Sequence, residues 1–277
     1  MIIDAHQHVW DIQRRELTWP GPNLPTLYHS FGIEDLMADS KEIGLTGSVL
    51  VQSQPDYADT LWLVEQAGRY PVVQAIVGWV QMDDPLAVGQ IAWLAQQPKF
   101  RGLRPMLQGL TDDDWVLRPN LDPAFRAMLS HGLTFDALIF PRHLPIIATL
   151  ARNWPGLTFI IDHGAKPPIG DVEGTQAWRE AILSIATLSN VACKLSGLIT
   201  EAAAGTSLDA LTPYADHLYA AFGPERLMWG SDWPVVNLRT PYKNWYDWTL
   251  TWLADKPVTA QFAILGRTAQ QLYRIGE

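Results

Sequence analysis

Three short polar motifs in this sequence each follow a run of apolar residues. The first motif, DAHQH, carries His6 and His8, whose side chains point to the same side if the segment is a strand. The second, DHGAK, supplies His163, and the third, GSDWP, supplies Asp232. Imidazole and carboxylate groups bind divalent metals and transfer protons near neutral pH. We therefore take these four residues as candidate catalytic and metal-binding residues.

Each of the four also has a structural interpretation that the motifs alone leave open. One histidine of the pair could cap a loop while the other packs in the core, and Asp232 could cap a following helix. A functional site is favoured because three separate apolar runs end in histidine or aspartate. If these runs are neighbouring parallel strands, their polar ends meet at one place.

Several other polar residues lie near the ends of apolar runs. Arg104 could bind a substrate carboxylate or carbonyl oxygen, or form a surface salt bridge. Lys166 closes the DHGAK motif. Lys194 and Ser196 alternate on one face of a run, where a lysine needs a partner, and a structural ion pair would supply it. The sequence assigns no role to Lys194 or to Glu201.

The spacing of the apolar runs predicts alternating strands and helices. Runs rich in Val, Ile, Leu and Phe start about 24 to 45 residues apart, and such near-continuous runs are typical of parallel strands covered on both faces. Helical periodicity is found between them at 58–67, 85–96 and 145–152. The predicted strands are 2–8, 47–52, 72–80, 102–107, 133–140, 157–163, 191–198 and 226–232.

Eight strand–helix units without a linker or composition break favour a single (β/α)8 TIM barrel over residues 1–277, an α/β fold whose main alternative is a doubly wound sheet. In a barrel, the active site lies at the C-terminal ends of the strands. The Pro- and Trp-rich stretch 10–30 is the longest irregular segment, and we interpret it as a lid loop over this end.

The composition excludes several classes of protein. The chain has 277 residues, 48% of them hydrophobic, and a net charge of −9, so we expect a large core and no nucleic-acid partner. The single cysteine, Cys193, permits no internal disulfide and is expected to be a buried apolar side chain. The N-terminus lacks the pattern of a signal peptide, and no apolar run is long enough to span a membrane. We therefore predict a cytoplasmic protein.

Five stretches in the chain together resemble the amidohydrolase superfamily, and within it the amidohydrolase-2 branch of sugar-lactone hydrolases of the fuconolactonase-like kind. The stretches are DAHQHVWD, FRGLRPMLQ, IIDHGAKPPI, NVACKLSGLITEA and FGPERLMWGSDWPV. The resemblance implies a TIM barrel with a hydrolytic site formed by His6, His8, His163 and Asp232. In this family the aspartate activates water and later protonates the leaving oxygen.

The resemblance leads us to predict hydrolysis of a small sugar lactone, such as fucono- or rhamnonolactone. Asp232 is the expected general base, with a pKa raised by imperfect solvation, and the three histidines are expected to polarise the carbonyl. Arg104 and Lys166 are expected to contact the lactone oxygens. Ser196, Trp10, Trp19 and Trp233 are expected to form walls for the sugar ring, with core packing as the alternative for each tryptophan.

The metal content is left open by the sequence. Metal sites of the family usually add a histidine or modified lysine from strand four or five, and residues 135–141 contain neither. His143 lies beyond them and is not included. A divalent ion, zinc first among them, could still be held by His6, His8, His163 and Asp232, and metal-independent catalysis is the alternative.

Two other functions remain as alternatives to the lactonase. The first is a metal-dependent decarboxylase of an unsaturated or aromatic acid, which would release carbon dioxide. The second is a non-catalytic sugar-acid binding protein, which would have no use for a carboxylate beside three imidazoles. A homo-oligomer is compatible with the sequence.

Overall fold

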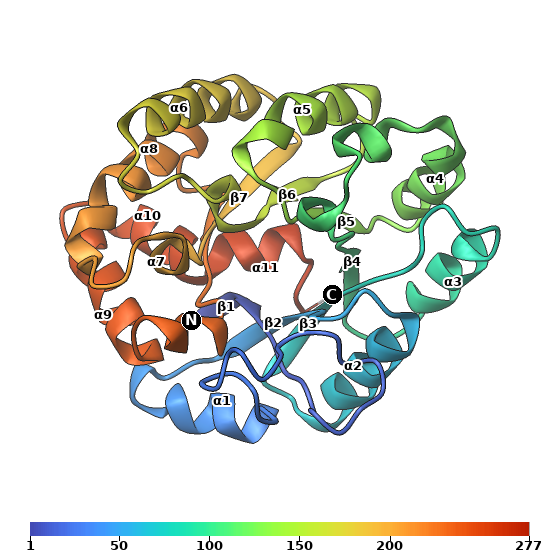
Figure 1. The fold of residues 1–277 in the computed structure, drawn as a ribbon, viewed down its shortest axis with the longest axis horizontal. Coiled ribbons are helices and arrows are strands. Elements are labelled where there is room, and N and C mark those ends of the chain that lie inside the picture. The colour runs from blue at the N-terminus through green and yellow to red at the C-terminus, as the bar shows by residue number, and fades with distance from the viewer. Residues whose placement is uncertain (277) are drawn as a thin grey trace.

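Eight parallel strands follow one another in sequence order around a central axis (Figure 1). The computed structural model describes residues 1–276. All eight predicted strands are present, and each ends one to four residues earlier than predicted because the polar residues at its end form the following loop. The strands are β1 (Ile3–Gln7), β2 (Gly47–Val51), β3 (Val73–Gly78), β4 (Phe100–Leu103), β5 (Thr134–Ala137), β6 (Phe159–Ile161), β7 (Val191–Leu195) and β8 (Leu227–Trp229).

The contact between the last strand and the first decides between a barrel and an open sheet. Beyond β8, the backbone N–H of Asp232 donates to the carbonyl of His6 at 2.8 Å, and the N–H of His8 donates to the carbonyl of Trp233 at 2.8 Å. Gln7 and Trp233 form a parallel bridge. The predicted (β/α)8 barrel is therefore confirmed. The junction between its last strand and its first strand includes the candidate site residues.

Helices form the outer layer around the strands (Figure 1). The three predicted helices are confirmed as α2, α3 and α5, and the side chain of Asp56 caps α2 by accepting from the N–H of Ala58. No helix in residues 1–276 is both long and apolar enough to cross a membrane. The helices are α1 (Ile33–Asp39), α2 (Tyr57–Arg69), α3 (Ala87–Leu94), α4 (Asp122–Ser130), α5 (Leu144–Asn153), α6 (Val172–Ala186), α7 (Leu198–Glu201), α8 (Thr212–Phe222), α9 (Tyr242–Leu253), α10 (Val258–Phe262) and α11 (Thr268–Leu272).

The core has two parts, one between the strands and the helices and one inside the barrel. The interior part consists mainly of small and branched side chains from the strands, such as Ala5, Val49 and Ile160. Tyr273, directly after α11, is fully buried among them. In Figure 1, α11 crosses the centre of the ring. The C-terminal end of the chain therefore closes the barrel at the end opposite the polar strand ends.

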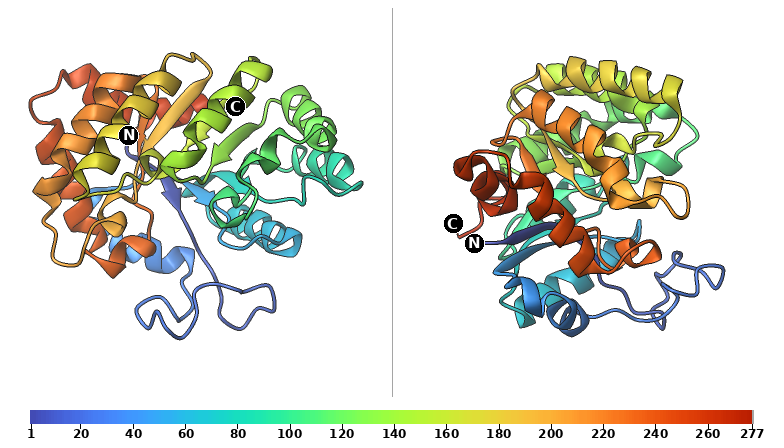
Figure 2. Two further views of the ribbon diagram at one scale, coloured as in Figure 1. Left: turned by 45° about the horizontal axis from the view of Figure 1, so that its top comes forward. Right: turned by 90° about the vertical axis from the view of Figure 1, so that its left-hand side faces the viewer.

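The segment between Trp10 and Phe31 forms a long loop, as predicted. These two residues pair in an antiparallel bridge at its base, with N–H to carbonyl distances of 3.1 and 2.9 Å. Figure 2 shows the loop projecting from the end of the barrel to which β1 leads. Gln54, after β2, holds the middle of the loop: its Oε1 accepts from the N–H of Thr18 at 2.8 Å, and its Nε2 donates to the carbonyl of Trp19 at 2.6 Å.

Asp59, in the first turn of α2, gives the stability of the protein a specific pH dependence. Its side chain is 2% exposed, and Oδ2 has no hydrogen-bond partner within residues 1–276. Burial raises the pKa of Asp59 to about 7, with Arg14 opposing this effect. The folded protein therefore holds an extra proton between about pH 4 and pH 7, and stability falls as the pH rises through this window.

Raising the pH from 5 to 8 is expected to lower the free energy of unfolding of wild type by about 2–3 kcal/mol more than that of Asp59→Asn. The reason is that the variant has no buried carboxylate to ionise. Urea unfolding at both pH values measures this difference, and Asp255→Asn is the control because its side chain is 82% exposed. An equal stability difference at pH 5 and pH 8 would show that Asp59 is not the titrating group.

Candidate active site

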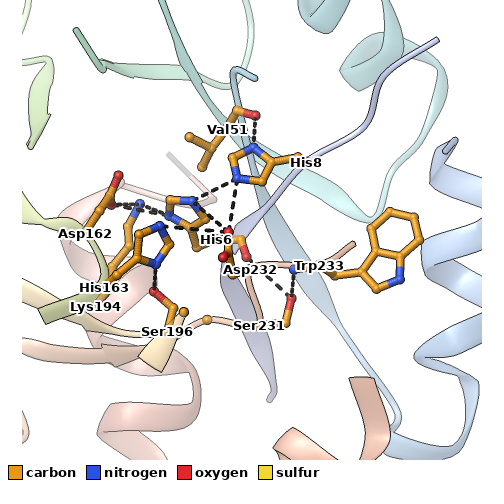
Figure 3. Close-up of polar contacts among 12 residues, drawn as sticks. His6, His8, Val51, Asp162, His163, Lys194, Ser196, Ser231, Asp232 and Trp233 are labelled. Atoms are coloured by element: carbon orange, nitrogen blue, oxygen red, sulfur yellow. Dashed lines mark hydrogen bonds and ion pairs between the residues drawn. The ribbon is translucent and has the colours of Figure 1, made fainter. Parts of the chain in front are cut away.

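Three imidazoles and one carboxylate meet at the polar end of the barrel (Figure 3). His6 Nε2 lies 3.1 Å from His8 Nε2 and 3.7 Å from Asp232 Oδ1. Asp232 Oδ1 is also 3.3 Å from His8 Nε2 and 3.9 Å from His163 Nε2. The four candidate residues from β1 and from the loops after β6 and β8 are therefore brought together, and all four are buried.

The backbone around these side chains adopts a rare conformation. Residues 163–166 have φ values of 55°, 58°, 60° and 55°, a left-handed turn in which only Gly164 avoids steric cost. Asp232 likewise has a φ of 61°. Such strain persists only where the surrounding structure holds it, and here it directs His163 and Asp232 toward each other.

Asp4, at the start of the DAHQH motif, holds the β8 end of the site in place. Its Oδ1 accepts from the backbone N–H of Ser231 at 2.8 Å, and its Oδ2 accepts from the Ser231 hydroxyl at 2.5 Å and from the Tyr242 hydroxyl at 3.1 Å. Burial raises the pKa of Asp4 to about 6, against these hydrogen bonds. Asp4 therefore joins the β1 and β8 motifs directly beside Asp232.

The histidines are oriented by partners at their second ring nitrogens. His8 Nδ1 lies 2.8 Å from the carbonyl of Val51, so Nδ1 donates its hydrogen and Nε2 faces Asp232. His163 Nδ1 is 2.9 Å from Ser196 Oγ. Burial lowers the pKa values of His163 and of His6, the latter well below its ordinary value. Both imidazoles are therefore neutral at pH 7.

The electrostatic surroundings of Asp232 differ from the expectation. Burial alone would raise its pKa, but the imidazoles of His163, His8 and His6 outweigh burial and hold the pKa below its ordinary range. The prediction of a raised pKa is therefore wrong, because it considered solvation without the three neighbouring rings. Asp232 is a carboxylate throughout the neutral pH range.

Two buried cations adjoin the histidines. Arg104 Nη1 lies 3.2 Å from Asp162 Oδ2 and 3.4 Å from His6 Nε2, and its Nη2 donates to the carbonyl of Gln52. Lys194 Nζ lies 3.0 Å from Asp162 Oδ1. Arg104 is 3% exposed, so the surface salt bridge considered from the sequence is not its role.

A cavity of about 500 Å³ opens onto this cluster. Its polar lining includes Arg104, Lys166 and three members of the histidine–aspartate cluster, His8, His163 and Asp232. The rest of the lining is mainly apolar, and the loop after Trp10 contributes Thr18 and Trp19 to the cavity. The apolar lining residues are Trp19, Pro55, Met106, Leu110, Leu138 and Val235.

Three residues expected to contact a ligand lie outside this cavity lining. The indole of Trp10 is buried and donates to the carbonyl of His29 at 2.8 Å, and that of Trp233 is buried and donates to Asp39 at 2.8 Å. Ser196 is buried behind His163. Trp10 and Trp233 thus follow the core-packing alternative and support the loop and the site, while Ser196 orients an imidazole.

Lys166 and Glu201 form an ion pair at the rim of the cavity, with 2.9 Å between Nζ and Oε1. Their side chains are 17% and 23% exposed, so the ammonium remains accessible from the cavity. His143 lies outside the cluster, because its Nε2 pairs with Asp113 at 2.8 Å.

The donor atoms of the cluster fit a divalent metal ion. In a tetrahedral zinc site with bonds of about 2.0–2.1 Å, neighbouring donors are about 3.3–3.4 Å apart. His6 Nε2, His8 Nε2 and Asp232 Oδ1 are 3.1 to 3.7 Å apart, and His163 Nε2 follows at 3.9 Å from Asp232. The ligand atoms of His6, His8 and Asp232 all lie within 4.8 Å of one another, close enough to bind one ion.

Comparison with known proteins agrees with this arrangement. The model of the family described as Amidohydrolase matches residues 3–275. The chain belongs to the amidohydrolase family. This amidohydrolase is 44% identical to L-fucono-1,5-lactonase from Burkholderia ambifaria over 278 residues, covering 99% of this chain and 95% of the relative. It is 30% identical to L-fucono-1,5-lactonase from Burkholderia multivorans, covering 99% and 96%.

A solved structure of an amidohydrolase from Burkholderia multivorans with bound zinc superposes on this chain with a TM-score of 0.93. The two sequences are 29% identical, and the match covers 99% of each chain. The resemblance to amidohydrolases that was based on five motifs is therefore confirmed over nearly the whole chain.

The sequence analysis of this amidohydrolase missed several residues around the histidines. Asp136 in β5 is the partner of Lys194, with 2.6 Å between Oδ2 and Nζ. A lysine and an aspartate that lie in apolar strands each need a partner of opposite charge. This requirement could have predicted that Lys194 and Asp136 form an ion pair. Gln52 and Gln54 follow β2, and the polar residues after β2 and β3 were not considered as site residues.

Proposed function

We propose that this amidohydrolase hydrolyses the ester bond of a small sugar lactone, an aldonolactone such as L-fucono- or L-rhamnonolactone. The observation that carries the proposal is the carboxylate of Asp232, held among three imidazoles in a cavity lined by both polar and apolar side chains. Two relatives that this chain covers almost fully are L-fucono-1,5-lactonases, which supports this substrate class.

Asp232 acts as the general base in this proposal. Its carboxylate takes a proton from water as the water oxygen bonds to the lactone carbonyl carbon, and it later gives that proton to the departing ring oxygen. The low pKa keeps Asp232 ionised but makes it a weak base. The lactone carbonyl must therefore be strongly polarised by other groups. The demand is lower than in an amidase, because an ester carbonyl needs less activation than an amide carbonyl.

When no metal is bound, His163 and Arg104 supply this polarisation, since His163 Nε2 cannot both carry a hydrogen and bind a metal. If Ser196 donates to His163 Nδ1, the Nε2 of the neutral ring carries the hydrogen and can donate it to the carbonyl oxygen. The guanidinium of Arg104 lines the same cavity and stabilises the negative charge that develops on that oxygen.

A divalent ion, zinc in the first instance, would be held by His6, His8, His163 and Asp232. When bound, it would act as a Lewis acid on the lactone carbonyl. Support comes from the spacing of His6 Nε2, His8 Nε2 and Asp232 Oδ1, and the related amidohydrolase from Burkholderia multivorans binds zinc. Full hydrolytic activity in chelator-treated protein with no measurable zinc would remove the metal from this proposal.

The sugar ring would lie in this cavity, in contact with both polar and apolar side chains. Lys166 and Arg104 face its oxygens, and the indole of Trp19 offers an apolar face. The loop after Trp10 acts as a lid over this ring, with Gln54 holding Thr18 and Trp19 in place. These contacts would select a ring with hydroxyls on one side and an apolar edge on the other.

Gly197 offers a test of the position of His163. Its φ is 63°, and an added Cβ would lie 2.4 Å from His163 Nδ1. We expect Gly197→Ala to lower kcat about 100-fold, because the ring must move away from the carbonyl oxygen. The matched control is Gly68→Ala in α2, where an added Cβ meets nothing within 4 Å. Unchanged kcat in Gly197→Ala would show that the ring position is unimportant for turnover.

A panel of aldonolactones that differ in ring size and stereochemistry, followed by proton release, tests the proposed function. We expect at least one 1,5-lactone to be hydrolysed well above the spontaneous rate. Carbon dioxide release from unsaturated or aromatic acids would instead indicate a decarboxylase. Thermal stabilisation by sugar acids, without turnover of any lactone, would indicate a binding protein.

A further inference from the structure

The ammonium group of Lys194 lies beside His6 and Asp162 under the histidine–aspartate cluster (Figure 3). Nζ is 2.6 Å from Asp136 Oδ2, 3.0 Å from Asp162 Oδ1 and 3.1 Å from His6 Nδ1. The Tyr273 ring centroid is 5.5 Å away, on the side of α11. The lysine side chain is fully buried. No water or surface group is therefore needed to complete its surroundings.

The three atoms around this ammonium are also good metal ligands. Two carboxylate oxygens and one imidazole nitrogen form a donor set that suits a divalent first-row ion. A different second group, His6, Asp162 and His163, has ligand atoms within 4.8 Å of one another and shares His6 and Asp162 with the atoms around the ammonium. We call the place of the ammonium the inner position, which His6 Nδ1 faces, and the place between His6, His8 and Asp232 the outer position, which His6 Nε2 faces.

The charges at the inner position are already balanced. Lys194 pairs with both Asp136 and Asp162, and Arg104 pairs with Asp162, so two cationic side chains already face these two carboxyl groups. A divalent ion placed at the inner position would meet the ammonium at contact distance and the guanidinium close by. The ammonium therefore already fills the space that such an ion would occupy, and the carboxyl groups that would balance its charge are already paired.

We propose that Lys194 occupies the inner of two adjoining cation positions, so that the barrel binds at most one divalent ion, at the outer position formed by His6, His8, His163 and Asp232. Lys194 thus acts as a resident cation and a positioning residue for His6. This inference rests on the geometry around Lys194 and is independent of which lactone the protein hydrolyses.

The test counts zinc ions in purified protein that has been stripped with chelator, reloaded with Zn²⁺ and freed of excess metal. Wild type is expected to retain one zinc per chain or fewer. His8→Ala/Asp232→Asn, which disables the outer position, is expected to retain none. Adding Lys194→Ala to this double variant is expected to create one zinc site, because the two carboxylates and His6 Nδ1 no longer face an ammonium group. Adding Asp136→Asn as well is expected to remove that site.

Two results would overturn the proposal. One is a Lys194→Ala triple variant that unfolds cooperatively, as wild type does, yet binds no zinc. The other is a wild-type chain that retains two zinc ions and loses one of them in Asp162→Asn, because the inner position would then accept a metal beside Lys194. This second measurement needs only the wild type and one conservative variant, so it decides the question even if Lys194→Ala does not fold. Lys166→Ala is the matched control and is expected to leave the zinc count of wild type unchanged.

Discussion

Asp232→Asn is expected to lower kcat for lactone hydrolysis at least about 1,000-fold while leaving the fold intact. The amide cannot take a proton from water, and no other carboxylate among the described residues lines the cavity. The amide keeps the size of the carboxylate and can still contact His8. Proton release measures the rate, and circular dichroism with thermal unfolding measures the fold.

The control for this prediction is Asp247→Asn, a half-exposed carboxylate in α9 that pairs with Lys243 and does not line the cavity. We expect its kcat to equal that of wild type. Turnover of Asp232→Asn within tenfold of wild type would exclude Asp232 as the general base. The cluster of imidazoles would then have to generate the nucleophile by itself.

Arg104→Met is expected to lower kcat/KM about 100- to 1,000-fold. The substitution keeps an unbranched apolar stem but removes the guanidinium that faces the cavity. Because Asp162 keeps Lys194 at 3.0 Å, its carboxylate still has a buried cationic partner. We therefore expect a larger loss in catalysis than in thermal stability.

Arg104→Lys separates the charge of this residue from its geometry. A lysine restores a positive charge but cannot contact Asp162 and the carbonyl of Gln52 at the same time, so we expect only partial recovery of kcat/KM. A kcat/KM within threefold of wild type in Arg104→Met would show that Arg104 is a structural ion-pair member only. The same kinetic assay applied to both variants distinguishes these outcomes.

The fold was predictable because the strands are buried on both faces and therefore stand out as apolar runs. The ends of these runs also revealed His6, His8, His163 and Asp232, since parallel strands place their C-terminal ends together. A single sequence could identify this convergence without any three-dimensional information.

Site features that depend on contacts between strands far apart in the sequence could not be predicted from the sequence. Lys194 and Asp136 come from β7 and β5, and only the barrel closure shows that their side chains meet. Trp10 and Trp233 lie next to the site in the sequence, yet their indole nitrogens are bound to His29 and Asp39, away from the cavity. Side-chain direction after a strand ends does not follow the alternation that holds within it.

The central claim is that Asp232 activates a water molecule that attacks the lactone carbonyl carbon. The position of the water oxygen in the product tests this claim most directly. A single turnover in H₂¹⁸O, with enzyme in excess over the lactone, is followed by mass spectrometry of the product. If Asp232 activates water for attack on the carbonyl carbon, the product carboxylate gains one ¹⁸O and the hydroxyl released from the ring gains none. Product without label would contradict this account, because the oxygen would then come from Asp232 acting as a nucleophile, and label in the hydroxyl would contradict attack at the carbonyl.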